Sequence, residues 1–175
     1  MVVSAPTPEH LTATVSRLAS WLRGTEATGD LAAVARALRT GRAAMDCRLA
    51  VVAGDTAELA ATLADFAGDP DGPVRAADLR DGRGTRQRLG EVPETGAFVA
   101  ELWRNGRLQQ LADLWLSGLD VDWSSLDGTA PAAPLASLPP SAFLRRSLWL
   151  DGPPGGRGNG ARTRPAARGR RTARA

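Results

Sequence analysis

The spacing of the apolar residues is the feature that most narrows the folds open to this chain. Early in the sequence they recur every three or four positions, as on one face of a helix, at Leu11, Val15, Leu18 and Leu22. Over residues 45–51 they recur at every second position instead, which is the period of a strand with one buried face. This change of period predicts a mixed α/β fold around one core.

Turn and cap residues divide the first 80 positions into elements. Helices are predicted to begin after Thr7, Asp30 and Asp55, the second of them ending at Gly41. Strands are predicted for the three stretches 1–5, 45–51 and 74–79. These elements predict a small α/β layer structure, in which two or three strands carry three helices.

The second half of the chain has a different character. Two helical stretches broken at Asn105–Gly106 predict a helical hairpin, and the Pro-rich residues 128–142 predict an extended arm. Beyond residue 150 no apolar periodicity is left, which is typical of disorder. The predicted divisions are an α/β subdomain, a region of helices and arm, and a disordered tail, at residues 1–90, 91–150 and 151–175.

Charge follows the same division. The formal net charge of the whole chain is +3, but residues 1–150 hold 15 arginines against 18 acidic residues, a net of −3. Residues 151–175 hold seven arginines and one acid, a net of +6. The basic character therefore belongs to the tail, which argues against a folded surface built to bind nucleic acid.

The residue counts exclude most catalytic and metal-binding sites. One cysteine, Cys47, and one histidine, His10, are too few for a disulfide, a common zinc site or a nucleophile with its own base. Cys47 is predicted to be a buried apolar residue and His10 an exposed one, while Asp120 and Asp122 are interpreted as turn residues. The chain is thus predicted to be no enzyme and to hold no cofactor or metal.

The ends and the hydropathy of the chain bear on its location. No apolar run approaches the roughly 18–20 residues of a membrane span. The first residues lack the basic and apolar regions of a secretory signal, and a single cysteine suits a reducing compartment. We therefore expect a cytoplasmic protein.

Four stretches together resemble a known family, the linker that follows the ketosynthase in modular type I polyketide synthases. They are the opening V-V-S-A strand with its T-P-E-H-L helix, and residues 38–55, 111–126 and 138–150. Only about 55 residues separate the second stretch from the third, with no G-H-S-x-G nucleophile between them. This spacing is similar to modules that lack an internal acyltransferase.

The resemblance implies a non-catalytic linker and docking module. The fold class that goes with it is a small three-stranded antiparallel sheet with helices on one face, followed by a helical hairpin and an extended Pro-rich arm. Its partners would be a ketosynthase, a free-standing acyltransferase, or both, with no role for a membrane. The implied packing anchors and polar clamps are Trp115, Trp123, Phe143, Trp149, Arg42 and Arg145. Domain core is the other interpretation of Trp115, and a solvated charge after a helix end is that of Arg42.

The arm departs from the family pattern at several positions. Ser141 and Ala142 stand where Tyr and Pro are usual, and Ser147 and Leu148 replace Arg and Tyr. These changes predict a weaker contact between the arm and a ketosynthase.

Two other hypotheses stay open at this point. The chain is either a fragment of a larger synthase gene with no function of its own, or a protein that binds nucleic acid through its basic tail. Neighbouring genes would separate a working part from a fragment, and deletion of 151–175 would test the nucleic-acid hypothesis.

Overall fold

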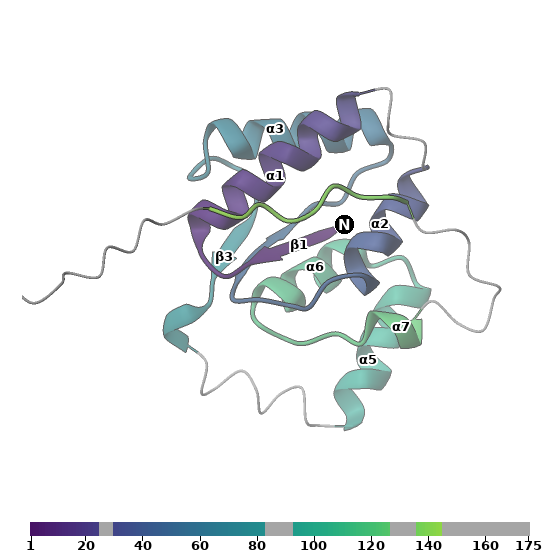
Figure 1. The fold of residues 1–175 in the computed structure, drawn as a ribbon. Coiled ribbons are helices and arrows are strands. Elements are labelled where there is room, and N and C mark those ends of the chain that lie inside the picture. The colour runs from purple at the N-terminus through teal and green to yellow at the C-terminus, as the bar shows by residue number, and fades with distance from the viewer. Residues whose placement is uncertain (25–29, 83–92, 127–135, 145–175) are drawn as a thin grey trace, which may run out of the picture. The chain divides into compact units, whose positions relative to one another are not determined.

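The computed structural model describes four stretches of the chain, residues 1–24, 30–82, 93–126 and 136–144. At its centre lies an antiparallel sheet of three strands, β1 (Val2–Ala5), β2 (Cys47–Ala50) and β3 (Ala76–Asp78), in the order β1-β2-β3 (Figure 1). The predicted fold class is confirmed. The predicted division between residues 90 and 91 and the predicted tail lie outside the described stretches.

Three helices supply the main core on one face of this sheet. They are α1 (Pro8–Arg23), α2 (Leu31–Thr40) and α3 (Thr56–Gly68), and α1 packs along α3. Side chains of the helices meet those of the strands in one apolar cluster, which includes Val15, Leu18, Val34, Cys47, Leu49, Leu59 and Leu63. Each of these seven residues is at most 1% exposed, so this layer is a closed hydrophobic core.

The predicted caps begin these helices. The backbone N–H of His10, Ala33 and Glu58 donates to the side chains of Thr7, Asp30 and Asp55, respectively. At the end of α2, a Cβ on Gly41 would lie 2.6 Å from the Ala37 carbonyl oxygen. Only glycine fits that approach, so the predicted helix stop is confirmed.

The other face of the sheet is covered by the helical hairpin. Its helices are α5 (Pro93–Arg104) and α6 (Leu108–Leu116), followed by the short α7 (Trp123–Leu126). The predicted break between α5 and α6 is present, and Gly106 there has a φ of +65°. Trp115 and Leu116 of α6 pack on Val2 and Ala50 of the sheet.

This covering corrects the prediction for residues 45–51. All four residues of β2 are buried, including Arg48 and Ala50, which the alternating pattern had assigned to a solvent-facing side. Met45, predicted to be buried, precedes the strand and is 42% exposed. The alternation failed because a second layer, α6, lies over the face that a two-layer fold leaves open.

One shorter element follows the sheet. A 3₁₀ turn over Arg80–Gly82 follows β3. None of the described helices is both long and apolar enough to cross a membrane.

Candidate docking surface

The arm lies as an extended segment along the body of the molecule. Residues 136–144 run beside α1, in green in Figure 1. Ala136 and Leu138 pack against the main core. The described part of the predicted arm therefore has a defined path over the helices that cover the sheet.

Hydrogen bonds with three side chains of the body, two that donate and one that accepts, fix this path. Nη2 of Arg42 donates to the Pro139 carbonyl at 2.6 Å. Nη1 of Arg17 donates to the carbonyls of Pro140 at 3.2 Å and Ser141 at 3.4 Å. We call Arg17, Arg42 and Thr14, whose contact follows, the arm cradle.

Thr14 supplies the buried contact of the cradle. Its Oγ1 accepts a hydrogen bond from the backbone N–H of Ala142 at 3.1 Å, and the two residues are 3% and 7% exposed. Thr14 lies one helical turn before Arg17 on α1, so both side chains reach the same side of that helix.

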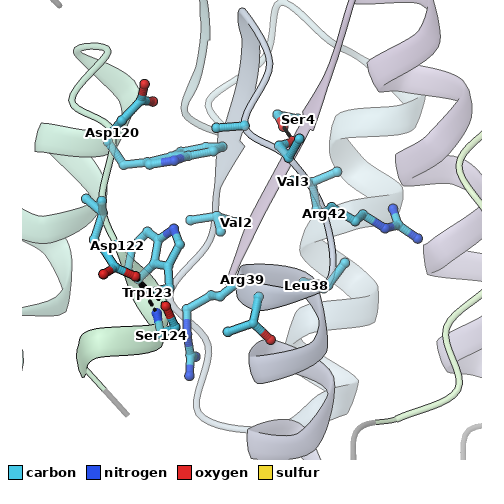
Figure 2. Close-up of a pocket in the computed structure, with 15 residues that line it drawn as sticks. Val2, Val3, Ser4, Leu38, Arg39, Arg42, Asp120, Asp122, Trp123 and Ser124 are labelled. Carbon is cyan, nitrogen blue, oxygen red and sulfur yellow. Dashed lines mark hydrogen bonds between the residues drawn. The ribbon is translucent and has the colours of Figure 1, made fainter. Parts of the chain in front are cut away.

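Arg42 follows the end of α2 and is half-buried. Burial lowers the pKa of its guanidinium from the ordinary value. One of its nitrogens, Nη1, is buried and has no hydrogen-bond partner in the described part of the chain. In Figure 2 its guanidinium points away from Asp120 and Asp122, on the side of the arm.

The arm turns outward immediately after its buried contact. Phe143 is 88% exposed and Leu144 is 42% exposed, next to the buried Ala142. A phenylalanine ring held at the surface by an anchored neighbour is the apolar feature most suited to contact another protein.

The other predicted anchors lie in different surroundings. Trp115 is 2% exposed and packs inside the chain, which is the domain-core interpretation. Trp123 is partly buried at the start of α7, against the small clusters of the hairpin. Arg145 and Trp149 lie outside the described residues.

Arg48 is a buried, hydrogen-bonded residue that the sequence pattern did not single out. Its Nη1 donates to the carbonyls of Trp115 at 2.9 Å and Leu119 at 3.0 Å, and its Nη2 to Asp120 Oδ1 at 2.6 Å. Its guanidinium also lies 4.9 Å from the centre of the Trp115 ring. A strand arginine thus donates to two carbonyls at and just beyond the end of α6, that of Leu119 and that of Trp115, which also accepts from the N–H of Gly118.

Asp120 and Asp122 border a cavity of about 210 Å³ between β1, the end of α2 and α7. Figure 2 shows the Asp122 carboxylate turned toward Ser124, whose N–H and hydroxyl donate to it. These bonds lower the pKa of Asp122, so the group is held as a carboxylate. Asp120 pairs with Arg48, and both acids act as structural residues.

The two remaining candidates for chemistry are also engaged in the fold. Nδ1 of the half-buried His10 lies 2.9 Å from Thr7 Oγ1. Burial, together with the nearby Asp78 carboxylate, raises the pKa of the Cys47 thiol to about 11. Among the described residues no group of three or more His, Cys, Asp or Glu is placed to hold a metal ion.

Most of the chain is similar in sequence to polyketide synthases. Polyketide synthase PksN of Bacillus subtilis is 33% identical over 150 residues, and polyketide synthase ThaG of Burkholderia thailandensis is 37% identical over 166 residues. These matches cover 85% and 93% of the chain. The chain spans only 3% of the length of each relative.

Solved structures carry the same fold. The ketosynthase from module 6 of the bacillaene synthase of Bacillus subtilis matches with a TM-score of 0.72 and 29% identity. That match covers 86% of this chain and 27% of the ketosynthase chain. A Streptomyces albus oxazolomycin ketosynthase domain matches at 0.58 and 30%, covering 86% of this chain and 22% of its own.

The family comparison is confined to the first part of the fold. The model of the RhiE-like, KS-MAT linker domain matches residues 2–69, from β1 to the end of α3. The polyketide synthase relatives extend the likeness over most of the rest. Residues 2–69 therefore match the RhiE-like, KS-MAT linker domain, and most of the chain is similar to polyketide synthases.

Proposed function

We propose that this chain is a non-catalytic linker and docking module of a polyketide synthase that packs on a ketosynthase through its arm. The observation that carries this is the embedding of the same fold within ketosynthase chains, of which it makes up about a quarter, 27% in the bacillaene example. The arm adds a specific contact, because its anchored end presents the exposed Phe143.

Three further parts of the proposal rest on the sequence. Residues 1–90 act as the ketosynthase-linker part and residues 91–150 as the part that returns to the partner. Arg145 and Trp149 extend the contact beyond Phe143, and Trp123 supports it from the hairpin. A cytoplasmic location goes with this role, as the single Cys47 suggests.

A free-standing acyltransferase is the second candidate partner. It is favoured by the sequence, since only residues 70–110 lie between the stretch that matches the linker domain and residues 111–126, too few for an inserted acyltransferase, and by the direct packing of the hairpin on the sheet through Arg48 and Trp115. The same purified chain is therefore to be tested against an acyltransferase of this class.

The experiment measures binding of the full chain to a ketosynthase from which the matching segment has been removed. The module 6 ketosynthase of the bacillaene synthase, trimmed of that segment and checked for folding by circular dichroism, supplies the probe. The intact ketosynthase is the control, because its own segment already occupies the surface. We expect binding to the trimmed form and none to the intact one.

Phe143→Ala then tests the arm. Truncation of an exposed aromatic anchor costs about 1–3 kcal/mol at an interface, so the affinity should fall roughly tenfold or more, without loss of folding. The matched control is Phe98→Ala on α5, since Phe98 is also exposed, at 55%. Equal effects of the two substitutions would contradict a role for the arm, and no binding by the wild type would favour the fragment hypothesis.

A further inference from the structure

The body of the molecule recognises the arm by its backbone. The hydrogen bonds that join the described arm to the body use main-chain atoms of the arm: the carbonyls of Pro139, Pro140 and Ser141, and the N–H of Ala142. The donors and the acceptor on the body are side chains of the arm cradle. Such a set of contacts orders the segment without depending on its side chains.

The arm sequence suits this kind of recognition. Two successive prolines restrict the backbone to extended conformations, which leave the carbonyls free of bonds within the segment. Those carbonyls are the ones that Arg42 and Arg17 contact. The prolines reduce the conformational entropy that the arm loses when it becomes ordered, and the hydrogen bonds of the arm cradle offset the rest.

The hydrogen bond at Ala142 is the buried contact of the arm cradle. The N–H of Ala142 is buried and would have no acceptor without Thr14 Oγ1, and an orphaned buried donor is unfavourable. A proline at this position would carry no N–H at all. Ala142 and Thr14 therefore form a matched pair within this chain.

We propose that Thr14, Arg17 and Arg42 are positioning residues that hold the arm ready, so that Phe143 meets its partner without a further ordering step. This inference rests on the docking function proposed above and adds the residues that control it. None of the three needs to touch the partner. Their contribution to binding is made in the free chain, by removing the entropy that an unattached arm would lose on docking.

The first test concerns the free chain alone. In Thr14→Val, which keeps the shape of the side chain and removes the acceptor, the Ala142 amide should exchange with solvent at least about tenfold faster by NMR. Ala142→Pro removes the donor and leaves the body unchanged; since proline has no amide to exchange, this variant takes the place of Thr14→Val in the binding test below if the valine variant folds poorly. Arg23→Gln, elsewhere on α1, is the matched control for Arg17→Gln.

The second test adds the partner. Thr14→Val with Arg17→Gln and Arg42→Gln should lower the affinity for the trimmed ketosynthase by about tenfold. In that background Phe143→Ala should lose most of its effect, because a detached arm no longer presents the ring. Arg23→Gln should leave the affinity at the wild-type value.

Each outcome decides between the two proposals. Faster exchange with an unchanged affinity would overturn the positioning role and leave the docking function standing. Unchanged exchange at Ala142 would overturn the positioning role directly. If the wild-type chain does not bind, the docking function fails and the positioning role fails with it.

Discussion

The two faces of the sheet are held by different kinds of interaction. On the face of α1 and α3 the contact is apolar throughout, and residues such as Leu49 and Leu63 are fully buried. On the face of α6 a buried arginine, Arg48, takes the central place beside Trp115. The apolar face is stabilised by the area that it removes from water. The other face is stabilised by the hydrogen bonds that Arg48 donates to carbonyls at the end of α6.

The comparison also separates what is general in this fold from what is local. The apolar face lies almost entirely within residues 2–69, the stretch that matches the linker family. The polar face joins that stretch to the hairpin, through contacts 67 to 72 residues apart in sequence. Arg48 thus connects the two parts of the chain that an inserted domain would otherwise separate.

The largest effect is expected for Arg48→Ala. It removes four hydrogen bonds, to Met45, Trp115, Leu119 and Asp120, and takes the arginine donor from the buried Leu119 carbonyl, while the Trp115 carbonyl keeps its bond from the Gly118 N–H. The free energy of unfolding should fall by about 3–5 kcal/mol, as measured by urea denaturation.

Two control substitutions allow the loss in Arg48→Ala to be compared with the strength of the apolar face. Leu63→Ala, on the apolar face, should cost a similar amount, about 2–5 kcal/mol, through the cavity it leaves. Arg48→Lys keeps the charge but not the fork of donors, so its loss should lie between wild type and Arg48→Ala. A loss below about 1 kcal/mol for Arg48→Ala would show that the two faces are not comparably strong.

A smaller effect is expected when the partner of Arg48 is changed. Asp120 is 76% exposed, so solvent screens its charge, and the carbonyl bonds of Arg48 stay in place. Asp120→Asn should lower the free energy of unfolding by less than about 1 kcal/mol in the same urea experiment. A loss equal to that of Arg48→Ala would show that the ion pair with Asp120, and not the carbonyl bonds, is what makes Arg48 stabilising.

The difference between the faces also explains which parts of the fold were predictable. Apolar periodicity and caps located α1, α2 and α3, because these elements obey local rules, as at Thr7 and Asp55. Arg48 was assigned to solvent because an arginine alternating with apolar residues usually faces water. Its burial depends on α6, whose position over the sheet is set by tertiary contacts that no local pattern records.

The docking surface was predictable to a lesser degree. The Pro-rich composition indicated an extended segment, and the family resemblance singled out Arg42 and Phe143. Thr14 and Arg17 carried no signal, since a threonine and an arginine on a helix are ordinary surface residues. Their role depends on where the arm crosses α1, and that crossing joins residues more than 120 positions apart.

The smallest effect is expected at a second arginine–aspartate pair, which differs from Arg48–Asp120 in having both partners at the surface. Arg80 contacts both carboxylate oxygens of Asp78, at 2.6 to 3.0 Å, and these bonds lower the pKa of Asp78 to about 2. A depressed carboxylate pKa stabilises the fold above the ordinary value near 3.8 and loses that contribution as pH falls toward 2. Asp78→Asn should therefore lower the urea midpoint only slightly at pH 7, because exposed pairs contribute little, and should reduce the acid-induced decrease between pH 4 and 2 by the same small amount. A change at pH 7 as large as that of Asp120→Asn would show that burial of the arginine is not what distinguishes the two pairs.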